Sequence, residues 1–195
     1  MKPIVIITAP AHPYLTQRLQ DKGFEVVLSE SVTYNELADI ISTATGLVVS
    51  TRIKIDQALL EKAVALKWIA RLGSGMELID TEFAASKNII CVSSPEGNAG
   101  AVGEHTMALL LNLMNKVSAS FAEVKNGLWI RDANRADALF GKTVGIIGMG
   151  HTGNAFASRL QSFGVQILAH DKYKQETDVK NVQFVDLATL CANAD

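Results

Sequence analysis

The N-terminal half of the chain alternates between short apolar runs and stretches in which apolar residues recur at helical spacing. Ile4–Ile7 is apolar without interruption, which is typical of a strand covered on both faces of its sheet. Further strands are expected at residues 25–28, 47–49, 68–72 and 89–92, and helices at 15–22, near 56–64 and at 80–87. Such an alternation favours a parallel sheet with helices on both faces. We therefore expect an α/β domain over residues 1–97.

Two local signals mark helix ends in this half. Gly23 follows the first helical pattern and suits the left-handed position after a helix. Thr33 and Glu36 have the spacing of a capping box, in which each side chain bonds the backbone N–H of the other residue. The apolar residues that follow predict a helix beginning directly after Thr33.

The alternation of strand-like and helix-like segments stops after Pro95, and all four prolines lie at or before this position. From Gly100 to about Lys125 there is no strand signal, and the residues are apolar most of the way round, which predicts a helix buried between units. We place the change of domain near Asn98 and expect a second α/β domain over residues 98–195. Its strands are expected at 143–147, 166–170 and 183–185, and its helices at about 151–163 and from 186.

The strongest chemical signal is the run GMGHTG, which follows the expected strand 143–147 and opens a helix. In a Rossmann unit the first glycine, here Gly148, allows a tight turn, and the second, Gly150, lets the backbone approach a pyrophosphate. The third, Gly153, lets the helix pack closely against the strand. The helix N-terminus, at His151 and Thr152, offers N–H groups and a positive dipole end to phosphates. This context predicts dinucleotide binding.

Asp171 lies 21 positions after Gly150, at the end of the next expected strand. The dinucleotide fingerprint has an acid about 20 residues after the glycines, where it binds ribose hydroxyls. A carboxylate there would repel the 2′-phosphate of NADP, so we expect NAD as the cofactor. Lys172 and Lys174 supply nearby positive charge, so the expectation is a preference for NAD.

Composition excludes several other classes of protein. Eighteen basic and 20 acidic side chains give a net charge of −2 and a pI of about 6.1, which predicts no nucleic-acid partner. The most apolar stretch, residues 107–114, is far shorter than the ~20 residues of a membrane span, so no membrane partner is expected. Cys91 and Cys191 have no metal or redox spacing, which indicates reduced thiols, no metal site and a cytoplasmic protein.

Three runs together resemble the D-isomer-specific 2-hydroxyacid dehydrogenases, a family that includes phosphoglycerate dehydrogenase. IARLGSGMELID at 69–80 is similar to the family's R-x-G-x-G-x-D-x-I-D, NAGAVGEH at 98–105 to its N-x-x-x-V-A-E, and GIIGMGHTG at 145–153 to its nucleotide fingerprint. The resemblance implies a flavodoxin-like substrate-binding domain followed by a Rossmann NAD-binding domain, here in its N-terminal part only. It also implies a homodimer, with the helix from Gly100 and the segment 129–140 as the contact arm.

The resemblance assigns roles to individual residues. Ser74 and Gly75 stand where the family's loop offers N–H groups to the substrate carboxylate, and Ser74 also lies near the cofactor. Asn98 is expected at the hinge between domains on the substrate side, and Val102 at the nicotinamide. Arg52 stands where the family's V-R-S-R-T-K stretch has an arginine that meets a substrate phosphate.

The sequence departs from the family at three of these places. Ser50 replaces the first arginine of that stretch, which argues against 3-phosphoglycerate as the substrate. Gly103 stands where the family commonly has Ala, and Glu77 stands near its Asp.

The family transfers hydride between a nicotinamide and C2 of a small 2-oxo or 2-hydroxy acid. An arginine orients the substrate, and a histidine held by a carboxylate moves the proton. In the family all three follow the segment matched here, so we expect no catalytic residue among these 195 and no activity of this chain alone. His105 is expected at a core or interface position.

Three alternatives stay open. One is a non-enzymatic regulator, because co-repressors of this family use NAD as a conformational ligand. A different Rossmann class that binds FAD or S-adenosylmethionine would share the glycine turn, but it leaves the runs around Ser74 and Asn98 unexplained. A formate or phosphite dehydrogenase of the same family also fits, because a carboxylate-binding loop does not report substrate length.

Overall fold

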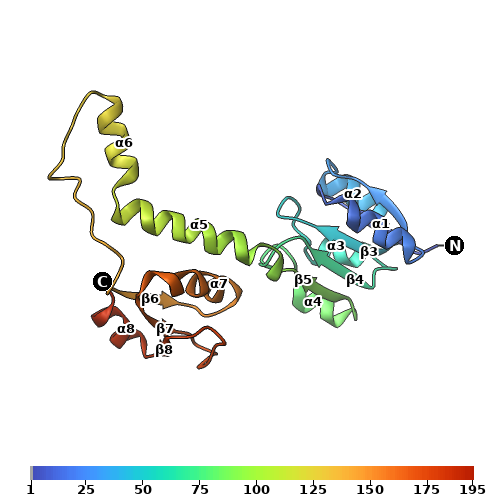
Figure 1. The fold of residues 1–195 in the computed structure, drawn as a ribbon. Coiled ribbons are helices and arrows are strands. Elements are labelled where there is room, and N and C mark those ends of the chain that lie inside the picture. Colours follow the sequence, from blue (N-terminus) through green and yellow to red (C-terminus); the bar gives the residue numbers. More distant parts are fainter. Residues whose placement is uncertain (1) are drawn as a thin grey trace. The chain divides into compact units, whose positions relative to one another are not determined.

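The computed structural model describes residues 2–195 and forms two compact units, Met1–Pro95 and Glu96–Asp195. This division falls two residues before the boundary placed at 97/98. Asn98 lies in the first turn of helix α5 (Glu96–Met114), three residues after the end of the first unit, and its expected role at the hinge between domains stays a prediction. Both units are α/β, in agreement with the expected fold class (Figure 1).

The first unit contains one sheet of five parallel strands in the order β2-β1-β3-β4-β5. This is the flavodoxin-like order and confirms that expectation. The strands are β1 (Ile4–Ile7), β2 (Glu25–Leu28), β3 (Ala44–Val49), β4 (Trp68–Arg71) and β5 (Ile90–Ser93). The sheet buries both faces: Val5 and Ile7 of β1 belong to one apolar cluster, while Ile6 belongs to the other.

The α-helices of the first unit begin at side-chain caps. They are α1 (Pro13–Asp21), α2 (Tyr34–Ile40), α3 (Gln57–Lys62) and α4 (Thr81–Ser86). The 3₁₀ turn η1 (Ile41–Thr43) follows α2 without a side-chain cap. The Thr33–Glu36 capping box is present, and Gly23 follows α1 at a φ of 87°. The carboxylates of Asp56 and Asp80 accept from the backbone of Leu59 and Phe83, so α3 and α4 start one residue after these acids.

The second unit contains three parallel strands in the order β6-β7-β8, which is one half of the Rossmann strand order. The strands are β6 (Thr143–Ile147), β7 (Gln166–His170) and β8 (Val182–Phe184). The helices that follow α5 are α6 (Val117–Lys125), α7 (His151–Leu160) with the 3₁₀ turn η2 (Gln161–Phe163), and α8 (Leu187–Asn193). Ile146 and Ile167 of the sheet pack with Met149 and with Phe156 and Leu160 of α7 to form its core.

The long apolar segment differs from the prediction in two ways. It forms two helices, because Lys116 adopts the left-handed conformation, with a φ of 50°, between α5 and α6. It is also not buried throughout: Leu113 is 76% exposed and Phe121 is 69% exposed. The physical reason is that α5 is covered mainly by α7, against which Gly103 is buried, while α6 stands away from the sheet of its unit (Figure 1).

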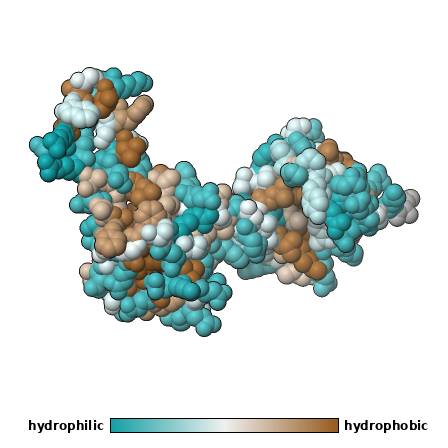
Figure 2. Space-filling view, in the orientation of Figure 1, coloured by the Kyte–Doolittle hydropathy of each residue, from teal (hydrophilic) through white to brown (hydrophobic). Residues whose placement is uncertain are grey.

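Apolar surface is visible on α6 and the segment after it (Figure 2). None of the helices within residues 2–195 has both the length and the apolar character needed to cross a bilayer.

Candidate dinucleotide and acid-binding sites

The glycine turn between β6 and α7 gives each of its three glycines a distinct environment. Gly148 has a φ of 94°, a conformation that side chains disfavour, and its N–H donates to the carbonyl of His170 at 2.8 Å. A Cβ on Gly153 would overlap the carbonyl oxygen of Gly148, so only glycine lets α7 start this close to the turn. Gly150 has an ordinary φ of −73°, and nothing lies within 4 Å of the place its Cβ would take. The backbone is therefore tightly packed between Gly148 and Gly153, while the space beside Gly150 is open.

The first turn of α7 lies at this open side. Gly150 is the N-cap residue and provides no side-chain cap, so His151 and Thr152 begin the helix without one. Uncapped N–H groups at a helix start attract an anion. The ring of His151 lies 3.8 Å from the carboxylate of Glu96, but both side chains are exposed, so the pair contributes little to stability.

Asp171 lies directly beside the glycine turn, because β6 and β7 are neighbours and end at the same edge. Its Oδ2 accepts from the backbone N–H of Met149 at 2.7 Å, and its Oδ1 accepts from Tyr173 and Lys174 at 2.8 and 3.0 Å. The hydrogen bond from Tyr173, followed by that from Met149, holds the pKa of Asp171 below its ordinary value. The carboxylate is therefore ionised, and three of its roughly four acceptor positions are already used.

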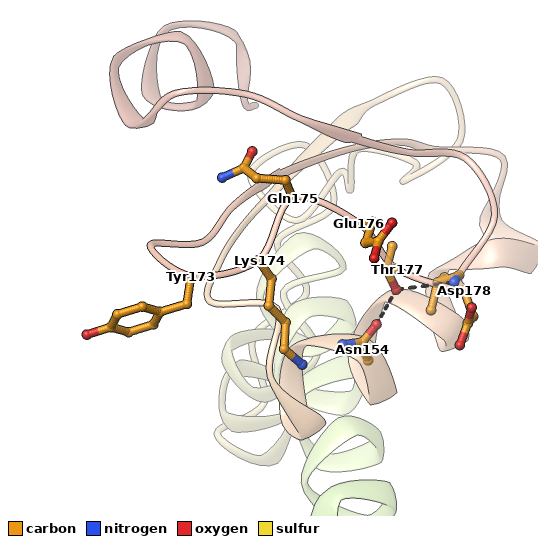
Figure 3. A pocket seen from close by; sticks show the side chains of 8 residues that line it. Asn154, Tyr173, Lys174, Gln175, Glu176, Thr177 and Asp178 are labelled. Atoms are coloured by element: carbon orange, nitrogen blue, oxygen red, sulfur yellow. Dashed lines mark hydrogen bonds between the residues drawn. The ribbon is translucent and has the colours of Figure 1, made fainter.

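A cavity of about 870 Å³ lies between the first turn of α7 and the loop after β7 (Figure 3). Its lining consists of Asn154 and of seven consecutive residues of that loop, Tyr173 to Val179. Asn154 and Thr177 are hydrogen-bonded to each other in the lining of this cavity. Sequence reasoning did not select Asn154, although its position directly after Gly153 was a signal that it lies near the turn.

In the first unit, the loops after β3 and β4 meet at the carboxyl edge of the sheet. They enclose a cavity of about 20 Å³, enough for about one water molecule, whose lining includes Ser50, Thr51, Arg71, Gly75 and Glu77. Gly75 is one of the residues expected to bind substrate. Ser74, next to it, is exposed on the same loop.

Two arginines, Arg52 and Arg71, lie near this loop in different environments. Arg52 was expected to bind substrate, but its Nη2 donates to the carbonyl of Val32 at 2.8 Å, and Arg52 does not line the cavity. Arg71 does line it, and its guanidinium lies so close to Gly73 that a Cβ there would overlap Nη1. Its position at the end of β4, directly before the glycine loop, was a signal that sequence reasoning passed over.

The remaining expected residues lie on α5. Asn98 is in its first turn, and Val102 follows one turn later with 36% of its surface exposed. His105 is exposed, so it is not a core residue, and the alternative expectation of an interface position stays a prediction. No group of three potential metal ligands among His, Cys, Asp and Glu occurs within residues 2–195.

The fold of the chain is shared with solved structures. The PH0520 protein from Pyrococcus horikoshii OT3 matches the whole chain with a TM-score of 0.82 and 29% sequence identity, and the match covers 61% of that protein. The shared fold, together with the glycine turn, defines the class as an α/β protein with a flavodoxin-like unit followed by a Rossmann-type unit.

The family model of the D-isomer specific 2-hydroxyacid dehydrogenase, catalytic domain, matches residues 5–190. The chain belongs to this family, as the three sequence runs indicated. It is 35% identical over 194 residues to D-3-phosphoglycerate dehydrogenase of Methanocaldococcus jannaschii and 36% identical over 191 residues to hydroxypyruvate reductase of Thermotoga maritima. Each match covers 98% of this chain, but only 37% and 62% of those two relatives.

Proposed function

We propose that this chain carries the dinucleotide-binding site of an NAD-dependent oxidoreductase that acts on the CH–OH group of a small D-2-hydroxy acid. The observation that carries the proposal is the contact between Asp171 and the glycine turn, with open space above Gly150. The uncapped start of α7 and the carboxylate of Asp171 lie side by side in this arrangement, which supports the binding of a diphosphate and of the adjoining ribose.

The residues present fit a nicotinamide dinucleotide. The N–H groups of Gly150, His151 and Thr152 would hold the diphosphate, and Asp171 would hold the adenosine ribose through its remaining acceptor position. Because three backbone donors keep Asp171 ionised, a 2′-phosphate would meet a negative charge there, which favours NAD over NADP. When bound, the nicotinamide supplies a hydride acceptor or donor.

We propose that the first unit binds the acid through the loop around Gly75. The N–H groups of Ser74 and Gly75 would hold the carboxylate, as in the family. Arg71, and not Arg52, is the positive group placed at this cavity, and its guanidinium is suited to a carboxylate or phosphate. The residues expected at the nicotinamide and at the substrate, Val102 and Asn98, lie on α5.

We further propose that the 195-residue chain alone does not catalyse hydride transfer. Proton transfer in the family requires a histidine held by a carboxylate. Within residues 2–195 the one histidine–carboxylate ion pair is His151–Glu96, and both of its side chains are solvent-exposed. A regulator of the same fold, for which NAD is a conformational ligand, stays the alternative proposal.

The apolar side chains of α6 and the following segment support a homodimer, with this arm as the contact surface. Phe121 and Trp129 are 69% and 82% exposed, and such residues are enriched at protein interfaces. A cytoplasmic location is proposed on the ground that Cys91 and Cys191 are both unpaired.

The proposed function is tested by titrating the chain with NAD and, separately, with NADP, with the heat of binding measured by calorimetry. Heat on binding of NAD, with weaker binding of NADP, supports the proposal. Absence of binding of either dinucleotide to folded protein contradicts it. An assay for NADH formation from 2-hydroxy acids then tests the expected inactivity.

A further inference from the structure

Asn154 contacts the glycine turn with one end of its side chain and the loop after β7 with the other. Its Nδ2 donates to the carbonyl oxygens of Met149 and Gly150 at 2.7 and 2.8 Å. Its Oδ1 accepts from the hydroxyl of Thr177, whose Oγ1 in turn accepts the backbone N–H of Val179 at 3.2 Å (Figure 3). The chemistry of these partners fixes the amide orientation, since carbonyl oxygens accept and cannot donate.

The bonds of Asn154 determine where two backbone N–H groups point. In a trans peptide the C=O and the N–H point in opposite directions. Because the carbonyl of Met149 points at Asn154, the N–H of Gly150 in the same peptide points away from it. The carbonyl of Gly150 likewise faces Asn154, so the N–H of His151 also points away. These are two of the N–H groups that the proposed dinucleotide site directs toward a diphosphate.

Asp171 completes the restraint on the same turn. Its carboxylate accepts the N–H of Met149, while Asn154 holds the carbonyl of Met149. The backbone N–H and the backbone C=O of Met149 are therefore both hydrogen-bonded to side chains that flank the turn. Met149 itself is fully buried, so its side chain adds an apolar anchor.

We propose that Asn154 is a positioning residue for dinucleotide binding, which aims the N–H groups of Gly150 and His151 and, through Thr177, couples the turn to the loop after β7. This inference rests on the proposed function and assigns a role to a side chain outside the G-x-G-x-x-G pattern. A diphosphate bound at the turn is then linked, through the Asn154–Thr177 hydrogen bond, to the loop of residues 172–179.

The experiment compares three ligands on the whole 195-residue chain: NAD, ADP and adenosine. Affinities are measured by calorimetry for the first two and by amide chemical shifts for adenosine. Asn154→Ala is expected to lower the affinities for NAD and for ADP by a similar factor, about tenfold or more, which corresponds to a loss of about 1.4 kcal/mol of binding free energy. Adenosine lacks the diphosphate, so its affinity is expected to stay unchanged.

Further variants separate positioning from folding. Thr177→Val is expected to lower the affinities for NAD and ADP by a smaller factor than Asn154→Ala does. Thr177→Ser keeps the hydroxyl, so it is expected to bind both ligands as the unsubstituted chain does. Gln161→Ala is the matched control: Gln161 also joins this helical segment to the loop, by donating to the carbonyl of Lys180 at 2.8 Å, but does not contact the turn. It is expected to leave all three affinities unchanged.

The outcomes are distinct. Unchanged NAD and ADP affinities in Asn154→Ala overturn the inference while the proposed function stands. Equal weakening of all three ligands together with a lower Tm also overturns it, because this is the result of general unfolding. Failure of the unsubstituted chain to bind NAD overturns the proposed function itself.

Discussion

The carboxylate of Asp171 accepts a hydrogen bond from the backbone N–H of Met149, with 2.7 Å between Oδ2 and nitrogen. The two residues are 22 positions apart in the chain, and the parallel pairing of β6 with β7 brings them to one edge of the sheet. The acid that the sequence pattern assigned to the ribose therefore also supports the turn assigned to the diphosphate. A change at Asp171 is expected to affect both.

Gly153 and Gly150 are expected to respond differently to the same substitution. Gly153→Ala brings a methyl group onto the carbonyl of Gly148, and overpacking of this kind costs about 1–3 kcal/mol of unfolding free energy. Gly150→Ala meets no atom within 4 Å and needs no unusual φ, so its stability is expected to stay near that of the unsubstituted chain. Its methyl group occupies the open side of the turn, so NAD affinity is expected to fall at least tenfold. Urea unfolding and calorimetry measure the two effects; a Gly150→Ala variant that binds NAD normally would contradict the placement of the diphosphate.

Asp171→Asn tests the preference for NAD over NADP. The amide removes the negative charge, so the ratio of NADP to NAD dissociation constants is expected to fall by about tenfold or more. Glu176→Gln is the matched control, because Glu176 lines the same cavity and its loss removes one charge without removing a contact to the turn. If both variants change this ratio equally, the effect comes from the total negative charge of the loop and not from the position of Asp171.

The pH dependence of Asp171 follows from its hydrogen bonds. The pKa is lowered by donors from Tyr173, Met149 and Lys174, so the ionised form is favoured in the folded state. The corresponding stabilisation is fully present above the ordinary pKa of about 4 and disappears as the pH falls through the lowered value. Carboxyl ¹³C shifts of Asp171 are expected to show a midpoint below the ordinary one. A midpoint at or above about 4 would show that these hydrogen bonds are absent in solution.

Two glycines of α5 give a second matched pair. A Cβ on Gly103 would lie 2.9 Å from the carbonyl carbon of Ala155 on α7, so Gly103→Val is expected to destabilise the chain by about 1–3 kcal/mol. A Cβ on Gly100 would meet only the Arg159 guanidinium, at 3.6 Å, so Gly100→Ala is expected to stabilise by up to about 1 kcal/mol through helix propensity. Thermal unfolding of both variants checks the packing of α5 on α7. Equal Tm changes of the same sign would refute it.

Much of this architecture could be predicted from local sequence signals. The strands β1, β2, β6 and β7 have the predicted bounds, because each contains a short apolar run that is followed by a polar residue or a glycine. The capping box at Thr33 and the turn at Gly148 were predictable because the relevant hydrogen bonds and dihedral angles depend on neighbouring residues.

Other features depend on tertiary contacts. The break at Lys116 has no local signal, since a lysine gives no sign of a positive φ. The orientation of Arg52 toward Val32 could not be predicted, because the two residues are brought together only by the fold. The same holds for Asn154 of α7, whose partner Thr177 lies in the loop after β7. Side-chain direction at a site is thus the part that the sequence pattern leaves open.

The exposed arm predicts self-association. The double variant Phe121→Glu/Trp129→Glu replaces two apolar side chains with charges and is expected to shift the chain toward monomer in sedimentation velocity at high concentration. Tyr173→Glu is the control, because Tyr173 is 84% exposed but lies on the loop after β7. A chain that is monomeric at every concentration before substitution would contradict the proposed dimer.

Titration of NAD into ¹⁵N-labelled chain, with heat measured in parallel, tests most directly whether the β6–α7 turn holds a dinucleotide. We expect saturable heat and the largest chemical-shift changes at the backbone amides of Gly150, His151 and Thr152. A smaller change is expected at the amide of Met149, through its hydrogen bond to Asp171. Folded protein that gives no heat and no shift at these amides would contradict the proposed dinucleotide site.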